Sequence, residues 1–420
     1  MIRKFLFLTL GLAVYAGYGG QGFAYLLAAI AGSYLAGLWI PKYKFLLWLT
    51  VLFHGGMLLL VKLQPVTGME LLAPLGLSYF TLRIISYCAD VYTGKIEPEY
   101  NFGRYCLYVS YLPCIFLGPI ESYDRFRVMA LENARITWDG ISMGLARLAW
   151  GAFKKMVIAS RISVVIGTIA ADTQLYRGAY ALLAMVLYSV QLYADFSGGI
   201  DMVLGVSGML GVPLSENFDT PYFSQSVQEF WRRWHMTLGA WLRNYVYIPL
   251  GGSRRGKFRK LFNTVVVFLV SGLWHGIHYL VWGVLNGIFV AFGDRFQTRY
   301  KWLNQIGTFV VITFLWAFFV WPDTGTSLEM AASVFTEFHL PEFLQGFGSL
   351  GLNLGEWIVL VLAAAGLWAF DLWKQPIREK FLSLEPAGRI SVACALALVV
   401  LVFGMYGLGF NAADFIYSNF

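Results

Sequence analysis

The segment 261–293 reads LFNTVVVFLVSGLWHGIHYLVWGVLNGIFVAFG and decides which class of fold the chain can adopt. Two apolar limbs of about 15 residues each meet at the polar break Trp274-His275-Gly276-Ile277-His278, and basic clusters flank both outer ends. At 1.5 Å per residue each limb reaches only about 22 Å, whereas the hydrocarbon core of a bilayer is about 30 Å thick. A polar break at membrane depth is tolerated only inside protein or beside a wet cavity. We therefore predict an interrupted membrane helix with a functional site at the break.

Composition extends this prediction to the whole chain. Of the 420 residues, 58% are hydrophobic and 13% are charged, whereas soluble domains carry roughly 25% charged residues. The apolar runs lack the period-two alternation of a membrane barrel. The predicted fold is therefore all-α, a polytopic transmembrane bundle of about 10–12 spans with short re-entrant or half-span helices around a buried histidine site. Candidate spans lie near 5–18, 22–40, 45–62, 70–90, 104–120, 140–170, 178–195, 261–275, 277–293, 306–321, 355–373 and 389–410.

Charge and linker content indicate one domain with two different faces. No long polar linker divides the chain, so residues 1–420 are expected to form a single membrane-embedded domain. Lysine and arginine concentrate on the cytoplasmic side of membrane proteins, which accounts for the net charge of +7 without a nucleic-acid partner. The mixed charges of 95–175 leave that part open, and 322–356, without lysine or arginine, is expected outside. The segments expected on the cytoplasmic side are 3–4, 42–44, 254–260, 295–301 and 374–380.

The first residues combine a basic start with an apolar run, as a signal peptide does. They lack a convincing cleavage site and continue into further apolar sequence. We therefore expect a retained first span.

His275 is the strongest catalytic candidate, because an ionisable side chain in a membrane segment is costly and is a functional hypothesis by default. It stands between Trp274 and Gly276 at the predicted break. An equally open alternative is a structural histidine that satisfies a backbone carbonyl at a helix kink. His278 lies one helical turn further along, where it could share a face with His275, and core or supporting duty is expected for it.

His235 lies in a second histidine segment, EFWRRWHMTL at 229–238. The large apolar side chains from Trp231 to Tyr245 follow the i, i+3, i+4, i+7 rule, which predicts one amphipathic helix. Such a helix could lie at the membrane interface with a tryptophan belt and lipid-facing arginines. His235 falls on the apolar stripe, so we expect it to be buried.

The remaining polar features favour plainer interpretations. Asp195 and Asp201 follow an apolar run near membrane depth and could line a polar cavity or, more simply, pair with arginine. The basic loop 251–260 could attract phosphate groups or anchor the cytoplasmic side. The four cysteines have no metal-type spacing and are expected to be ordinary thiols. The sequence contains no zinc motif, P-loop, dinucleotide fingerprint or nucleophile elbow, so no metal site is predicted.

At these residues the chain resembles the membrane-bound O-acyltransferase family. The resemblance rests on FWRRWHMTL at 230–238, continued by WLRNYVYIPLGG at 241–252, and on LWHG at 273–276, about 40 residues after His235. The segments PLGLSYFT at 74–81, DVY at 90–92, GPI at 118–120 and DFSG at 195–198 are similar to the bacterial branch. The likeness covers about residues 70–320. It is greatest to proteins that O-acetylate alginate, other exopolysaccharides or peptidoglycan, and more distant to the teichoic-acid D-alanylation protein.

The resemblance implies transfer of an acyl group, above all acetyl, from a cytoplasmic thioester to a hydroxyl of a cell-surface or exported polysaccharide. The donor would be acetyl-CoA or an acyl carrier protein, and no bound cofactor is expected. An alcohol is a poor nucleophile at neutral pH, and a general base contributes about 10²–10⁴-fold. His275 is expected as that base, because burial favours the neutral imidazole, and His235 would orient the acceptor or polarise the thioester carbonyl. The substrate-binding residues expected from these segments are Trp234, Trp274, Asp195, Arg233 and Asn244.

Three other functions stay open on the sequence alone. D-alanyl transfer from a carrier protein toward teichoic acid would use the same histidines. A relay would pass the acyl group to a separate extracytoplasmic transferase. A polysaccharide or lipid transporter would share the polar break and basic loops, but it is expected to show internal repeats, and none is persuasive here. In every case the expected location is the cytoplasmic membrane, which the chain would cross several times.

Overall fold

The computed structural model describes residues 2–69, 71–293 and 297–406. Within these ranges all regular structure is helical and no strand occurs, which confirms the predicted all-α class. The turns η1, η2 and η4 are π-helical, and η3, η5 and η7 are 3₁₀. In chain order the elements are α1 Ile2–Gly19, α2 Gln21–Trp39, α3 Phe45–Lys62, α4 Gln64–Thr67, α5 Leu77–Tyr92, α6 Phe102–Val109, α7 Leu112–Ile115, α8 Tyr123–Phe126, η1 Arg127–Glu132, α9 Trp138–Phe153, η2 Lys154–Ala159, α10 Ser160–Ala171, α11 Ala179–Met209, η3 Pro221–Phe223, α12 Val227–Arg233, α13 Met236–Leu242, η4 Arg243–Tyr247, α14 Lys257–His275, η5 Ile277–Tyr279, α15 Leu280–Phe292, α16 Lys301–Val320, α17 Thr324–Thr336, α18 Leu340–Gly346, η7 Phe347–Ser349, α19 Leu354–Leu372, α20 Lys374–Leu382 and α21 Pro386–Phe403.

The described part of the chain contains six helices that are long and apolar enough to cross a membrane. They are α2, α3, α11, α16, α19 and α21. Shorter apolar stretches lie within α1 and along η5 and α15. The protein is therefore a polytopic helical membrane protein. In the described residues, the helices within the other predicted spans do not combine this length with this apolar character.

The predicted span 104–120 is wrong, because α6 and α7 are two short helices separated by a break. The fully buried Arg83 of α5 compensates for the helical hydrogen bonds lost in this stretch. Its guanidinium donates to the carbonyl oxygens of Tyr108, Cys114 and Pro119 at distances of 3.2, 3.1 and 3.4 Å. Irregular backbone at membrane depth needs such internal partners.

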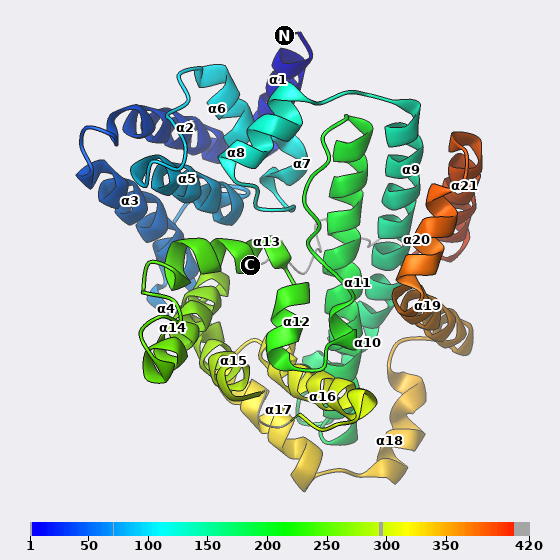
Figure 1. Ribbon diagram of the computed structural model, residues 1–420. Helices are drawn as coiled ribbons and strands as arrows, with labels where there is room; N and C mark the ends of the chain where they lie inside the picture. Colours follow the sequence, from blue (N-terminus) through cyan, green and yellow to red (C-terminus); the bar gives the residue numbers. More distant parts are fainter. Residues whose placement is uncertain (1, 70, 294–296, 407–420) are drawn as a thin grey trace.

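The helices α9 and α11 form the centre of the molecule and lie side by side (Figure 1). Glycines let their backbones approach closely. A Cβ placed on Gly151 of α9 would lie 2.5 Å from the carbonyl oxygen of Gly198 in α11, and one on Gly144 would lie 2.5 Å from that of Gly205. Contacts between small residues are the usual way to pack helices in lipid. The predicted span 178–195 forms the first part of α11, which continues to Met209 and has 31 residues.

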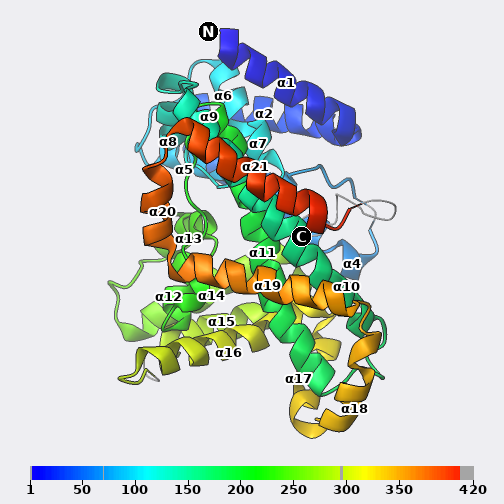
Figure 2. The same ribbon diagram turned by 90° about the vertical axis from the view of Figure 1, so that its right-hand side faces the viewer.

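The two faces of the bundle differ in charge. Figure 2 shows α8, α13 and α20 along one edge, and α4, α10 and α18 along the opposite edge. The first edge carries the basic segment 374–380, whereas the opposite edge includes part of 322–356, which has no lysine or arginine. We call the side of α8, α13 and α20 the basic face. The segments predicted to be cytoplasmic and external thus lie at different edges, and which edge faces the cytoplasm stays a prediction.

Candidate active site

The predicted polar break lies at the end of α14. The helix ends at His275, and the chain turns at Gly276, whose φ of 149° favours glycine. The 3₁₀ turn η5 follows, and α15 returns along α14. The first limb is longer than predicted, since α14 begins at Lys257 and has 19 residues, whereas α15 has 13. His278 lies beyond the turn, so it does not continue the helical face of His275.

His275 is enclosed by aromatic rings. Its side chain is buried at 7% exposure. Ring-centre distances from its imidazole are 4.7 Å to Trp274, 5.5 Å to Phe319, 5.7 Å to Trp282 and 6.1 Å to Tyr279. These rings come from α14, η5, α15 and α16, so the enclosure forms only when the hairpin packs on α16.

His235 occupies a second break, between α12 and α13. The prediction of one continuous amphipathic helix is therefore wrong. His235 has the left-handed backbone angles φ 44° and ψ 54°, which are uncommon for residues other than glycine. The side chain is buried at 3% exposure, as expected. Its ring lies 4.9 Å from that of Phe196 and 6.3 Å from that of Trp274.

Trp274 connects the two histidines, because its indole contacts both imidazoles. The ring of Tyr79 on α5 packs edge-on against the same indole at 6.3 Å. In the described part of the chain, neither Trp274 Nε1 nor Tyr79 Oη has a hydrogen-bond partner, although both are buried. An unsatisfied buried donor costs about 1–3 kcal/mol. A ligand oxygen beside the histidines would remove that cost.

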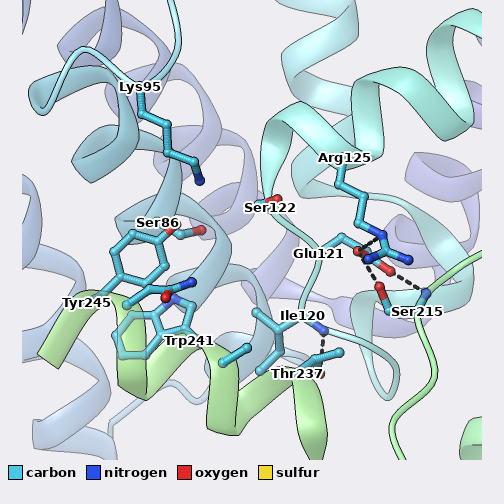
Figure 3. A pocket seen from close by; sticks show the side chains of 12 residues that line it. Ser86, Lys95, Ile120, Glu121, Ser122, Arg125, Ser215, Thr237, Trp241 and Tyr245 are labelled. Atoms are coloured by element: carbon cyan, nitrogen blue, oxygen red, sulfur yellow. Dashed lines mark hydrogen bonds and ion pairs between the residues drawn. The ribbon is translucent and has the colours of Figure 1, made fainter. Parts of the chain in front are cut away.

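A polar cavity of about 160 Å³ lies beside α13 at the basic face (Figure 3). The ammonium of Lys95 pairs with Asp90 at 2.9 Å, and Arg125 pairs with Glu121 at 3.5 Å. The cavity is therefore polar without a large excess of positive charge. Its lining includes Ser86, Lys95, Glu121, Arg125, Thr237, Trp241, Asn244 and Tyr245.

A family model described as the membrane-bound O-acyltransferase family matches residues 70–323. This match covers more than half of the chain and includes both histidine segments. The chain belongs to the membrane-bound O-acyltransferase family.

Three relatives of this chain are named as acyl-transfer proteins that act on different polymers. The probable alginate O-acetylase of Pseudomonas aeruginosa is 33% identical over an aligned length of 332 residues, and the match covers 76% of this chain and 62% of the relative. The peptidoglycan O-acetyltransferase of Helicobacter pylori is 32% identical over 63% of this chain and 56% of its own length. The teichoic acid D-alanyltransferase of Streptococcus thermophilus is 29% identical over 59% of this chain and 64% of its own length. The chain thus spans less than two thirds of the length of these relatives.

Three of the predicted site residues of this acyltransferase-family chain lie around the histidine pair rather than between the two imidazoles. Trp234 packs in an aromatic cluster, with ring-centre distances of 5.4 Å to Phe230 and 5.3 Å to Trp316. Arg233 forms an ion pair with Glu229 at 2.6 Å. Asn244 is exposed on η4 and lines the polar cavity. The structure therefore places Trp274 with both histidines, and the other three around them.

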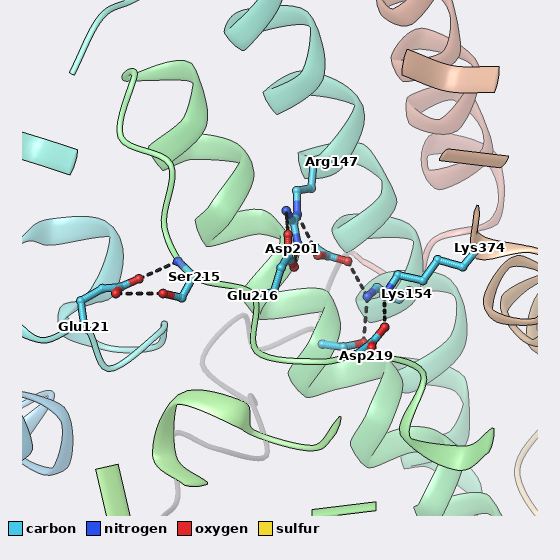
Figure 4. A network of polar contacts seen from close by, with 9 residues as sticks. Glu121, Arg147, Lys154, Asp201, Ser215, Glu216, Asp219 and Lys374 are labelled. Carbon is cyan, nitrogen blue, oxygen red and sulfur yellow. Dashed lines mark hydrogen bonds and ion pairs between the residues drawn. The ribbon is translucent and has the colours of Figure 1, made fainter. Parts of the chain in front are cut away.

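Asp195 lies within α11 rather than at its end, and the residue is 1% exposed. It pairs with Lys155 of the π-turn η2, so the expected partner type, arginine, is wrong for this residue. Asp201 bonds to Lys154 at 2.6 Å and to Arg147 at 2.9 Å (Figure 4). The turn η2 directs two successive lysines toward α11, as local π-turns allow.

Several residues around the two histidines were not predicted from the sequence. Asn217, with no exposed surface, bonds to the ring of His235, and Tyr79 and Phe319 contact the central rings. Tyr79 lies within the family-like segment 74–81, which offered a signal for it. Asn217 belongs to no motif, since only its tertiary contacts distinguish it from other polar loop residues.

Proposed function

We propose that this protein transfers an acyl group, in the first instance acetyl, from a cytoplasmic thioester to a hydroxyl of a cell-surface or exported polysaccharide. His275 is the general base. The observation that carries this proposal is the enclosure of His275 and His235 around one indole in a chain of the O-acyltransferase family. Buried imidazole in an apolar enclosure favours the neutral form, which can accept a proton.

His275 and Trp274 have separate roles in the proposed reaction. The hydroxyl oxygen of the acceptor attacks the thioester carbonyl carbon while His275 takes the hydroxyl proton. The new C–O bond forms, the C–S bond breaks, and the departing thiolate receives the proton from His275. Trp274 Nε1 donates to the carbonyl oxygen as negative charge develops there. No bound cofactor takes part in these steps.

The donor enters from the basic face. Support comes from the polar cavity there and from Thr237, which lines it two residues after His235. Asn244 in the same lining contacts the donor. The proposed thioester donors, acetyl-CoA and an acyl carrier, both carry phosphate, which the basic loop 254–260 attracts. The acceptor approaches from the opposite face, so neither substrate crosses the membrane, and that membrane is the cytoplasmic one.

Asp195, Arg233 and Trp234 remain predicted substrate-binding residues. Their contacts support a role at the margin of the site rather than at the reacting atoms. Arg233 and Asp195 are held in ion pairs, and Trp234 lies among aromatic rings.

Acetyl transfer is preferred to D-alanyl transfer because the alginate and peptidoglycan relatives are 33% and 32% identical, against 29% for the D-alanyltransferase. A relay to a separate extracytoplasmic transferase uses the same chemistry and is distinguished by experiment. Family membership favours all of these acyl-transfer functions over a transporter.

The test is transfer of labelled acetyl from acetyl-CoA by the purified protein in lipid vesicles, with alginate oligosaccharide or peptidoglycan fragments as acceptor. We expect His275→Ala to lower the rate by about 10²–10⁴-fold. His278→Ala, beyond the turn, is the matched control and should retain most activity. Undiminished transfer by His275→Ala at equal protein level would overturn the assignment. Transfer only after adding an extracytoplasmic partner would establish the relay.

A further inference from the structure

Asn217 sits at the centre of a small hydrogen-bonded cluster around the second histidine. Its side chain has no exposed surface. Its Oδ1 accepts from the backbone N–H of Thr237 at 3.0 Å and from the Thr237 hydroxyl at 2.9 Å. His235 Nδ1 lies 3.3 Å from the same oxygen. The side-chain oxygen of Asn217, a residue 18 positions before His235, therefore makes three contacts with the start of α13.

These contacts determine which way the amide of Asn217 faces. A backbone N–H can only donate, so the atom opposite Thr237 N must be the carbonyl oxygen of the amide. The hydroxyl of Thr237 accepts from Ile120 N at 3.0 Å, which leaves its proton for Asn217. His235 Nδ1 thus faces an oxygen that carries no proton. A neutral imidazole makes that contact only with its proton on Nδ1, and Nε2 then holds the lone pair.

The backbone around Asn217 holds the left-handed conformation of His235. Met236 N donates to the carbonyl oxygen of Asn217 at 3.0 Å, and Asp219 N donates to that of Arg233 at 2.9 Å. These bonds replace helical hydrogen bonds on both sides of His235. Strained backbone of this kind clusters at functional sites, where the surrounding structure must hold it.

Side chains on both sides of Asn217 anchor the segment 215–219 to the rest of the fold (Figure 4). Each anchor comes from a different element, so the position of Asn217 is set independently of α13. The anchors are hydrogen bonds between side chains or from a backbone N–H. The Glu121 carboxylate accepts from the backbone N–H and hydroxyl of Ser215 at 2.6 and 2.9 Å. The Arg147 guanidinium donates to the Glu216 carboxylate at 2.7 and 2.5 Å, and the Lys374 ammonium donates to the Asp219 carboxylate at 2.6 Å.

We propose that Asn217 is a positioning residue that holds His235 in the Nδ1–H tautomer, so that Nε2 is a hydrogen-bond acceptor in the active site. This inference rests on the proposed acyl transfer and narrows the role of His235 within it. An Nε2 lone pair accepts the O–H of a second hydroxyl of the polysaccharide, beside the one that His275 deprotonates, and so orients the acceptor, whereas it cannot donate to the thioester carbonyl. Polarisation of that carbonyl then falls to Trp274 Nε1.

The tautomer can be measured without any activity assay. The protein is labelled with ¹⁵N-histidine, reconstituted in lipid vesicles and studied by solid-state NMR at neutral pH. The His235 signals are identified by their loss in His235→Gln. We expect a protonated, pyrrole-type Nδ1 and an unprotonated, pyridine-type Nε2. A protonated Nε2 in the wild-type protein would overturn the proposal, even if acyl transfer is confirmed.

Variants of Asn217 separate positioning from general stability. Asn217→Ala removes the acceptor, so the tautomers should mix and the maximal transfer rate should fall at least about 10-fold, with the KM for acetyl-CoA little changed. Asn217→Asp keeps an acceptor and should retain the tautomer. Its added negative charge favours imidazolium, so the acid limb of the pH–rate profile should move to higher pH.

The matched control is Asn263→Ala, because Asn263 is equally buried and donates to the carbonyl oxygens of Leu250 and Gly252, away from His235. Its tautomer signals and rate should remain those of the wild type. Equal effects of Asn217→Ala and Asn263→Ala would contradict the positioning role. If Asn217→Ala does not fold, the wild-type spectrum and the Asn217→Asp pH profile still decide the question.

Discussion

Trp274 separates two imidazoles that lie about 40 residues apart in the sequence. Its ring packs on both, at 6.3 Å from His235 and 4.7 Å from His275. Its Nε1–H is buried without a hydrogen-bond partner in the described ranges. At the scale of single residues, the site thus combines two nitrogen acceptors with one indole donor. That combination suits a reaction in which a hydroxyl loses a proton while a carbonyl oxygen gains charge.

The first prediction concerns this donor. Trp274→Phe keeps an aromatic ring between the histidines but removes the N–H group. Loss of one oxyanion donor typically lowers the rate by about 10²–10³-fold, so we expect that decrease in acetyl transfer with little change in thermal stability. The control is Trp357→Phe, which removes another buried indole N–H remote from the site. Equal rates for the two variants would exclude a role for Trp274 Nε1.

At the scale of elements, the hairpin of α14 and α15 places His275. Gly283 lets α15 touch α14, since a Cβ there would lie 2.5 Å from the carbonyl oxygen of Phe268. Gly272 likewise lets η5 touch α14, since a Cβ there would lie 2.5 Å from the carbonyl oxygen of Tyr279. Small residues at such contacts are general in membrane proteins. The position of His275 therefore depends on these two glycines, which leave room for close backbone contact, as well as on the side chains that pack around it.

The second prediction tests this contact. Gly283→Val should separate α15 from α14, because the new Cβ would meet the Phe268 carbonyl oxygen. Overpacking costs about 1–3 kcal/mol, so we expect a lower midpoint of thermal unfolding and a reduced rate. In α3, a Cβ on Gly55 meets nothing within 4 Å, and Gly55→Val should leave both measurements unchanged. A stable, fully active Gly283→Val would show that the close contact is dispensable.

The third prediction concerns the anchor of the segment 215–219. The hydrogen bond from Lys374 lowers the pKa of Asp219. Its contribution to stability is therefore complete above the ordinary carboxyl pKa and is lost as the pH falls through the lowered value. Both side chains are well exposed, at 36% and 56%, so the pair contributes at most about 1 kcal/mol.

Thermal unfolding of the wild type and Lys374→Ala at low ionic strength measures this contribution. The two proteins should differ slightly at pH 7 and converge below about pH 4, or at high salt. A difference that grows on acidification would contradict the sign of the linkage.

At the scale of the whole molecule, the two faces of the bundle divide the chemistry. The polar cavity and the basic segments lie on one side, and the helices of 322–356 lie on the other. The histidine pair is buried between them. This arrangement suits an enzyme whose donor and acceptor arrive from opposite sides of a membrane.

The fourth prediction tests this orientation with single cysteines in a variant whose native cysteines are replaced. Ser349 and Ser383 are both exposed and follow α18 and α20, respectively. In intact cells, a membrane-impermeant maleimide should label Ser349→Cys at once, and Ser383→Cys only after permeabilisation. Both should react in detergent. The opposite pattern would reverse the assignment of the faces, and with it the proposed side of donor entry.

Hydropathy and loop charge by themselves determined the all-α membrane class, the polar break at His275 and the difference between the two faces. Each of these features follows from the hydropathy or charge summed over a stretch of neighbouring residues. The transfer of apolar side chains into lipid and the side on which lysine and arginine lie both depend on this local composition. The histidine pair was also predicted, although its evidence in the sequence was a family resemblance rather than a physical argument.

Tertiary structure alone decided two further helix breaks, in 104–120 and at His235, and which groups meet. The segment 104–120 resembled a span by its hydropathy, but the buried Arg83 satisfies the carbonyls of a broken chain there. The periodicity around His235 predicted one helix, yet Asn217 supplies bonds that stabilise a left-handed break. In both cases the deciding hydrogen-bond partner lies many residues away. Periodicity and hydropathy contain no information about such partners, so only the folded chain could reveal them.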